Sequence, residues 1–138
     1  MNIYFSCSLT GGRQDEAVYQ AIVKHLEMKG CQVLTAHLAR PDAMLDEAQV
    51  EARDVYLRDV GWIETCDAVI AEVSTPSHGV GYEIALALLK RKPVLCIYAR
   101  GKGVSKMITG NDMPSLQVKA YDGMSDLMEM LDQFLAGL

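Results

Sequence analysis

The chain has 138 residues, of which 50% are hydrophobic, and a formal net charge of −5. A chain of this length buries roughly 65–70% of its unfolded surface on folding, which suffices for one core and predicts a single domain over residues 1–138. The negative charge argues against a nucleic-acid polymer as partner, because such binding needs a basic surface. A small phosphorylated ligand stays possible, since one helix N-terminus and one arginine can hold a phosphate.

The sequence also predicts where the chain resides and which groups it does without. No segment reaches the roughly 20 apolar residues needed to span a bilayer, so no membrane association is expected. Residues 1–9 carry no basic segment of the kind that opens a signal peptide, which favours a cytoplasmic protein. The four cysteines lack C-x-x-C spacing and the three histidines are scattered, so we expect no disulfide framework, no metal site and no cofactor.

Strand-like and helix-like hydrophobic patterns alternate along the chain. In chain order they predict strand 2–7, helix 14–29, strand 31–34, loop 38–45, a long helix 46–65, strand 68–73, helix 79–92, strand 94–98, loop 101–114 with a helical turn at 104–108, strand 116–120 and helix 125–135. This alternation is typical of an α/β fold, here a doubly wound, flavodoxin- or Rossmann-like five-stranded parallel sheet with helices on both faces. The ligand should then lie at the carboxyl ends of the strands.

Two glycine-containing loops follow predicted strands and are candidate binding segments. Ser8-Leu9-Thr10-Gly11-Gly12-Arg13 follows the first strand, and residues 74–83 follow the third. Glycines let backbone N–H groups approach a ligand, and hydroxyls at a helix N-terminus can hold a phosphate. Neither a P-loop nor a G-x-G-x-x-G pattern is present. The alternative to a binding role for the first loop is therefore a tight connection between strand and helix.

Glu83 is placed in the first turn of an apolar helix that is expected to be buried. A buried acid is costly unless it is used or paired, and the helix dipole should favour its ionised form, as a nucleophile requires. The alternative is a first-turn glutamate that only stabilises its own helix.

Asp59 lies at the centre of an apolar and aromatic helix face, formed by Ala52, Val55, Tyr56, Trp62, Ile63 and Cys66. Burial would raise its pKa and make it a candidate proton donor, and the alternative is an aspartate paired with an arginine or a backbone group at the helix edge. Arg58 and Asp54 are expected to be solvated. Two carboxylates in different environments are the usual equipment for breaking a glycosidic bond.

Three motifs resemble the nucleoside 2-deoxyribosyltransferase family, and most closely its 2′-deoxynucleoside 5′-phosphate N-hydrolase branch. They are Tyr4-Phe5-x-x-Ser8-Leu9-x-Gly11-Gly12-Arg13, Asp59-x-x-Trp62 with Asp67, and Ala71-Glu72-Val73-Ser74-x-Pro76-Ser77-x-Gly79-Val80-Gly81-Tyr82-Glu83. The resemblance spans nearly the whole chain and is weakest around residues 41–47.

The resemblance implies a role for each matching residue. Glu83 would attack C1′ and form a covalent deoxyribosyl-enzyme, Asp59 would face the base and assist its departure, and Tyr4 would orient Glu83. The 5′-phosphate pocket and its surroundings would comprise Ser8, Gly11, Gly12, Arg13, Ser77 and Gly79, with Ser105 lent by the other subunit of a homodimer and His37 near the base or sugar.

The predicted function is therefore hydrolysis of 2′-deoxynucleoside 5′-monophosphates to base and 2-deoxyribose 5-phosphate. Transferases of the family act on unphosphorylated nucleosides and use an asparagine from the partner chain. Asn111 lies in the corresponding loop region but not at the aligned position, which favours the hydrolase. A nucleotide-sensing domain without catalysis is a further alternative, because one fold serves many functions.

Overall fold

Five parallel strands form one sheet in the order β2-β1-β3-β4-β5 in the computed structural model, which describes residues 1–138. The strands are β1 (Asn2–Ser6), β2 (Gln32–Val33), β3 (Ala68–Glu72), β4 (Val94–Ala99) and β5 (Leu116–Tyr121). All five lie within a residue or two of their predicted positions. The α/β fold with a five-stranded parallel sheet is confirmed.

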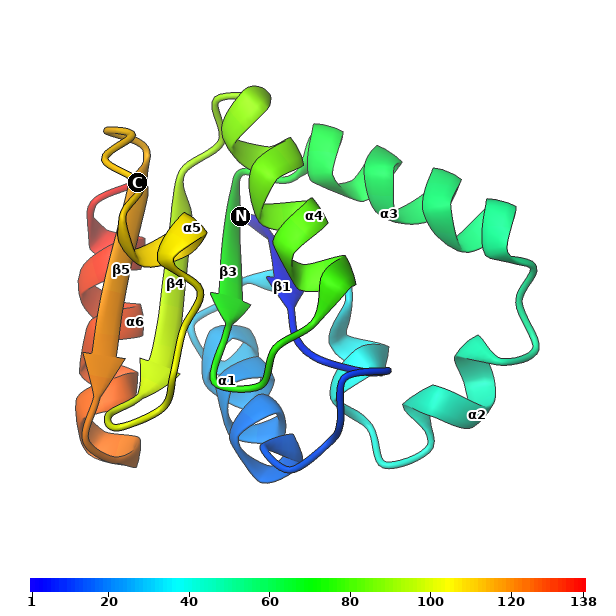
Figure 1. The fold of residues 1–138 in the computed structure, drawn as a ribbon, viewed down its shortest axis with the longest axis horizontal. Coiled ribbons are helices and arrows are strands. Elements are labelled where there is room, and N and C mark those ends of the chain that lie inside the picture. Colours follow the sequence, from blue (N-terminus) through cyan, green and yellow to red (C-terminus); the bar gives the residue numbers. More distant parts are fainter.

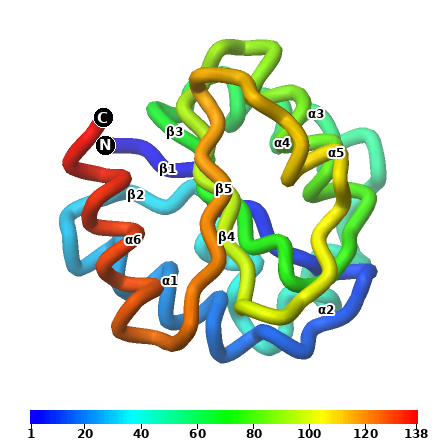
Figure 2. The backbone as a smooth tube through the Cα atoms, turned by 60° about the vertical axis from the view of Figure 1, so that its left-hand side comes forward, coloured from blue at the N-terminus to red at the C-terminus, as the bar shows by residue number.

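Helices cover both faces of the sheet, as Figure 2 shows. α1 (Glu16–Met28) and α6 (Met124–Ala136) lie on one face, whereas α3 (Ala52–Thr65), α4 (His78–Leu89) and α5 (Lys106–Thr109) lie on the other. Each face has its own hydrophobic core, because successive strand residues point to opposite sides. None of the helices is long and apolar enough to cross a membrane.

The segment between β2 and α3 differs from the prediction. The expected loop over 38–45 contains a 3-10 turn, η1 (Ala36–Ala39), and the start of a short helix, α2 (Ala43–Glu47). The expected single helix over 46–65 is two helices, because Glu51 adopts an extended backbone with φ −61° and ψ 138°. The carbonyl of Glu51 then accepts the N–H groups of Asp54 and Val55, which starts α3 afresh.

α2 and the first half of α3 extend away from the strands (Figure 1). Ile63 is the one buried residue of α3, so only the last part of this helix packs onto the body. The apolar face that the sequence predicted along this helix is therefore buried only near the C-terminal end of α3.

Strand order places the crevice at β1. The chain moves from β1 to β2 on one side and then to β3 on the other, so the carboxyl ends of β1 and β3 flank the point where strand order reverses. Ser6 pairs with Ala71 at the last register position of these two strands. Thr35 supports the edge beyond the two-residue β2, because its hydroxyl accepts from the Phe5 N–H at 3.0 Å and donates to the Phe5 carbonyl at 2.6 Å.

Candidate active site

β1 presents two polar side chains to the α4 side of the sheet. Tyr4 and Ser6 are two residues apart and share one face, while Ile3 and Phe5 join the core on the α1 side. Both polar side chains are almost completely buried. The alternation of the strand therefore directs a phenol and a hydroxyl toward α4 at the switch point.

Glu83 lies on α4 opposite these two side chains. The Ser6 hydroxyl donates a hydrogen bond to Oε2 of Glu83. Burial raises the pKa of Glu83 to about 7, while hydrogen bonding to Ser6 and the influence of Tyr4 act in the opposite direction. Glu83 is the sixth residue of α4, beyond the first turn in which the sequence placed it. The expected helix-dipole preference for the ionised form is thus outweighed by desolvation in this structure.

Tyr4 has a fully buried side chain whose hydroxyl has no hydrogen-bond partner of regular geometry. Burial, followed by the negative charges of Glu83 and Asp59, raises its pKa far above the ordinary value. The phenol therefore stays protonated, and it can stabilise a nearby anion by donating a hydrogen bond to it. An unpaired buried hydroxyl in this position is one that a reacting group could use.

Asp59 lies on α3 with its side chain 16% exposed and is held by its sequence neighbour. Arg58 Nε donates to Asp59 Oδ1 at 2.8 Å. Burial raises the pKa of Asp59, the hydrogen bond and charge of Arg58 oppose that rise, and the charge of Glu47 adds to it. The direction of the shift is the one expected for the predicted proton donor, whereas the pairing with an arginine is what the alternative interpretation expects. The expectation that Arg58 is solvated is wrong.

One cavity of about 200 Å³ brings the two carboxylates together. Asp59 contributes from α3 and Glu83 from α4, with Gly79 at the start of α4 and apolar side chains completing the wall. Its lining residues are Ala52, Val55, Tyr56, Asp59, Val60, Ile63, Gly79, Tyr82, Glu83 and Leu86. An ionisable pair thus faces a small, largely apolar space.

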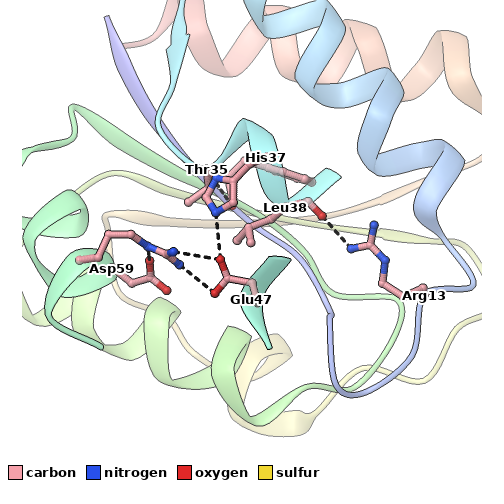
Figure 3. Close-up of polar contacts among 8 residues, drawn as sticks. Arg13, Thr35, His37, Leu38, Glu47 and Asp59 are labelled. Carbon is pink, nitrogen blue, oxygen red and sulfur yellow. Dashed lines mark hydrogen bonds and ion pairs between the residues drawn. The ribbon is translucent and has the colours of Figure 1, made fainter. Parts of the chain in front are cut away.

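Arg58 and Glu47, which the sequence did not predict, connect Asp59 to the predicted site residue His37 on η1. Arg58 forms a two-pronged ion pair with Glu47, at 2.9 and 3.1 Å, and Glu47 also contacts Nε2 of His37 at 3.1 Å. Figure 3 shows His37, Glu47 and Asp59 as one group. Trp62 supports it, with the Arg58 guanidinium 4.9 Å from the ring centroid and the His37 ring at 5.8 Å.

Arg13 reaches η1 from the other side, as Figure 3 also shows. Its guanidinium donates to the carbonyls of Leu38 and Arg40, both at 2.7 Å, and pairs with Glu16 at 3.2 Å. The predicted phosphate ligand therefore binds backbone oxygens in this structure. A phosphate at Arg13 would have to share the guanidinium with these carbonyls or displace it.

A larger cavity of about 820 Å³ lies along the opposite face of α4 and does not include Glu83. It gathers three of the predicted phosphate-pocket residues, Gly11, Ser77 and Ser105, within one chain. Its other lining residues are Thr10, Val73, Thr75, Pro76, His78, Val80, Gly81, Ile84, Ala85, Leu88, Gly103, Val104, Met107, Ile108 and Asn111. The first turn of α4 separates it from the smaller cavity, since Ser77 lines one and Gly79 the other.

The loop after β1 is fixed by close packing. A Cβ on Gly11 would lie 2.1 Å from the Pro76 carbonyl oxygen and 2.8 Å from Ser8 Oγ. Gly12 has φ +123°, a conformation that favours glycine. The Ser8 hydroxyl is buried without a hydrogen-bond partner. The two glycine-containing loops therefore contact each other directly.

Glu72 anchors the second of these loops from below and was also missed by sequence reasoning. Its fully buried carboxylate accepts from the Ser74 hydroxyl, from the Ser74 N–H at 3.2 Å and from the Tyr121 hydroxyl at 3.2 Å. Ser74 Oγ accepts in turn from the Ala99 N–H at 2.8 Å. Burial raises the pKa of Glu72. This cluster ties the carboxyl ends of β3, β4 and β5 together.

The signals that could have indicated the missed residues are weak. Ser6 is two positions from Tyr4, which places it on the same strand face. Arg58 is adjacent to Asp59 in sequence but does not lie on the apolar helix face predicted around Asp59. Its partner Glu47 lies on α2, which the sequence analysis predicted as part of one long helix with α3. No local pattern relates these two side chains.

Comparisons with known proteins identify the family of this chain. Residues 3–128 match the family described as nucleoside 2-deoxyribosyltransferase. The chain is 41% identical over 136 residues to a Danio rerio protein named 5-hydroxymethyl-dUMP N-hydrolase, covering 94% of each chain. It is 39% identical over 137 residues to a Methanosarcina mazei protein named "putative 2′-deoxynucleoside 5′-phosphate N-hydrolase 1", covering 99% of this chain and 85% of that one.

Among solved structures, the fold is similar to a Clostridium botulinum CMP N-glycosidase. The TM-score is 0.74 at 20% identity, covering 97% of this chain and 99% of the other. A 2-deoxyribosyltransferase from Bacillus psychrosaccharolyticus gives a TM-score of 0.65 at 20% identity, covering 93% and 90%. The match over residues 3–128 and the relatives at about 40% identity together show that this chain belongs to the nucleoside 2-deoxyribosyltransferase family.

Proposed function

We propose that this chain is an N-glycosidase that hydrolyses 2′-deoxynucleoside 5′-monophosphates to free base and 2-deoxyribose 5-phosphate. The observation that carries the proposal is the shared cavity of Glu83 and Asp59, with Ser6 bonded to Glu83 and the Tyr4 phenol buried beside it. The names of the relatives from Danio rerio and Methanosarcina mazei, each of which specifies N-hydrolysis of a deoxynucleotide, support the same reaction.

In the first step the Glu83 carboxylate attacks C1′ of the substrate. The C1′–N bond breaks as the C1′–O bond forms, and the electron pair of the broken bond leaves with the base, which takes up a proton from Asp59. Burial raises the pKa of Asp59, which is the direction that a proton donor requires. A carboxylate below C1′ stabilises the oxocarbenium-like transition state, which the missing 2′-hydroxyl makes easier to reach.

In the second step water attacks C1′ of the glycosyl-enzyme. The C1′–O bond to Glu83 breaks, its electrons return to the carboxylate, and the water proton passes to Asp59, which is ready for the next cycle. Hydrogen bonding from Ser6 lowers the pKa of Glu83 and therefore makes the carboxylate a better leaving group in this step.

The 5′-phosphate is assigned to the start of α4 and the loops around it. Ser77 begins the helix without a side-chain cap, so the first N–H groups of α4 have no side-chain acceptor. The buried Ser8 hydroxyl is likewise unpaired. Arg13 would add charge once its contacts with the η1 carbonyls rearrange, and His37 would lie toward the base or sugar.

One assay separates the candidate functions. The protein is incubated with each deoxynucleoside 5′-monophosphate, with 5-hydroxymethyl-dUMP, with a ribonucleotide, and with thymidine plus free adenine, and the products are separated by chromatography. Free base from the deoxynucleotides alone supports the hydrolase. Base exchange between nucleosides would instead establish a transferase, and no product in any tube would favour a sensor.

The covalent step has its own test. Intact-protein mass spectrometry after rapid acid quenching should show an adduct of deoxyribose phosphate that is absent from Glu83→Gln. Peptide mapping should locate it to Glu83. A turnover-competent protein that never forms the adduct, including at short times, would point to direct attack by water.

We also propose that the chain acts as a homodimer in which Ser105 completes the neighbouring site. Ser105 is exposed, and Met107 beside it is an exposed large hydrophobic residue at 85% exposure. Leu89, near the end of α4, is 79% exposed. A second copy would cover these apolar side chains and the 820 Å³ cavity beside them.

A cytoplasmic location also stays a prediction.

Complementation tests which site Ser105 serves, since it shares a cavity with Ser77 of its own chain. Mixing Ser105→Ala with Glu83→Gln should restore activity above either variant if Ser105 serves the partner, because one site then has both an intact Glu83 and an intact Ser105. Mixtures without any gain would assign Ser105 to its own chain. Sedimentation of the unmixed protein checks that dimers form.

A further inference from the structure

Arg58 pairs with two acids, Asp59, which lines the small cavity, and Glu47, which does not. Its Nε donates to Asp59 at 2.8 Å, while its two terminal nitrogens donate to both oxygens of Glu47 at 2.9 and 3.1 Å. All three side chains are largely shielded, with 24% of Arg58, 15% of Glu47 and 16% of Asp59 exposed. Partial burial strengthens such charge pairs relative to exposed ones.

The guanidinium is also held in place by an aromatic ring. Its carbon lies 4.9 Å from the Trp62 centroid, a distance that suits a cation–π contact. Three hydrogen bonds use three of its five N–H groups in a planar fork, a pattern that a lysine cannot reproduce. Arg58 therefore connects α2 to Asp59 in one fixed geometry.

Arg58 and Glu47 influence the ionisation of Asp59 in opposite senses. Arg58 favours the Asp59 anion by hydrogen bonding and charge, whereas the Glu47 charge disfavours it. Burial opposes ionisation of Glu47, but Arg58 and then His37 lower its pKa overall, so Glu47 remains an anion. The other groups that act on Asp59 are His37 on η1, whose charge lowers the Asp59 pKa, Glu83, which lines the small cavity with it, and Tyr4 on β1.

We propose that Arg58 is a positioning residue whose division between Asp59 and Glu47 sets how readily Asp59 holds and releases the proton for the departing base. The proposal rests on the role of Asp59 under the proposed function. Under this proposal Glu47 also influences the proton on Asp59, although Glu47 lines neither cavity. A stronger Arg58–Glu47 pair leaves less positive charge for Asp59, and a weaker one leaves more.

Two substitutions should move Asp59 in opposite directions. Arg58→Gln removes the positive charge and leaves Glu47 uncompensated, so the pKa of Asp59 should rise by about one unit. Glu47→Gln removes the negative charge and frees Arg58 for Asp59, so the pKa should fall. Arg58→Lys keeps the charge without the fork and should lie between the parent and Arg58→Gln.

The measurement is NMR titration of carboxyl-labelled aspartate in the ligand-free protein, with Asp59 assigned from Asp59→Asn. The matched controls are Arg53→Gln and Asp54→Asn, which make the same charge changes at exposed positions of α3. They should leave the Asp59 midpoint unchanged. The alkaline limb of the pH profile of kcat/KM, which reports the free enzyme, should follow the NMR midpoint in each variant.

Opposed shifts confined to positions 47 and 58 support the proposal. Unchanged midpoints, shifts of the same sign, or equal shifts in the controls would overturn it. The NMR readout needs no turnover, so an inactive parent protein would refute the proposed function while the coupling of Arg58 to Asp59 is still measured. If Arg58→Gln fails to fold, Arg58→Lys and Glu47→Gln carry the same test.

Discussion

Ser6, the last residue of β1, donates its hydroxyl hydrogen to the Glu83 carboxylate on α4. Two side chains that are 77 residues apart in sequence, one on a strand end and one on a helix, thus meet at the group proposed as nucleophile. Because the hydrogen bond stabilises the anion, it offsets part of the cost of burying Glu83.

Replacing Ser6 by alanine should weaken catalysis by raising the pKa of Glu83 further. Loss of a hydrogen bond to a charged group is expected to reduce kcat/KM about tenfold or more. The acid limb of the kcat/KM profile, expected near the Glu83 pKa of about 7, should move to higher pH. Ser125→Ala, at an exposed position of α6, is the control. An unshifted limb would mean that Ser6 does not act on the nucleophile.

Glu83→Gln should abolish turnover and stabilise the fold at alkaline pH. A carboxyl whose folded-state pKa is raised from 4.5 to about 7 binds its proton more tightly when folded. The free energy of unfolding of the parent therefore falls as the pH rises between these values, by at most about 3 kcal/mol. The uncharged variant lacks this loss. Urea unfolding at about pH 5 and about pH 8 should show the two proteins diverging, and parallel curves would contradict the assigned burial.

Gly11→Ala should damage both stability and nucleotide binding. Its Cβ would lie 2.1 Å from a backbone carbonyl of the neighbouring loop, so the two loops must separate. We expect a loss of about 1–3 kcal/mol in stability and a raised KM for the nucleotide. Gly103→Ala is the matched control, because Gly103 lines the same large cavity with nothing near its Cβ position. Equal effects of the two changes would remove packing as the cause.

Tyr121→Phe should destabilise the cluster around Glu72. It removes one of the donors to a fully buried carboxylate, at a cost of about 1 kcal/mol. The loss should grow as the pH rises, because the raised pKa of Glu72 means that more of the anion must be stabilised. Thermal unfolding across pH measures this effect, with Tyr98→Phe, which has no hydroxyl partner, as the control. A stability difference between parent and variant that is the same at every pH would show that the effect of Tyr121 does not depend on the ionisation of Glu72.

Much of the fold was predictable from pattern alone. Continuous apolar segments bounded by turns identified β3 and β4, and the alternation of strands and helices indicated the parallel sheet. The segment from Leu38 to Glu51 could not be predicted in the same way. Its helices are short and half-exposed, so they lack the periodic apolar face on which such predictions depend.

The candidate site was predictable in its chemistry but not in its contacts. Glu83, Asp59 and Tyr4 follow from residue type and family resemblance, and the structure places all three near one cavity. Arg58 was assigned to solvent because helix geometry alone turns it away from Asp59, yet its long side chain returns to form the hydrogen bond. Pairings between separate elements, such as Arg58 with Glu47, depend on tertiary packing.

The alternation of β1 has a consequence for how this strand can evolve. Ile3 and Phe5 pack in the core on the α1 side. Tyr4, which packs in the core on the α4 side, and Ser6 lie on the face toward Glu83. A library selected only for folding should accept phenylalanine at position 4 and alanine at position 6, and one selected for turnover should reject both. Residues next to each other in this strand are therefore constrained by different requirements, one for a folded domain and the next for a working one.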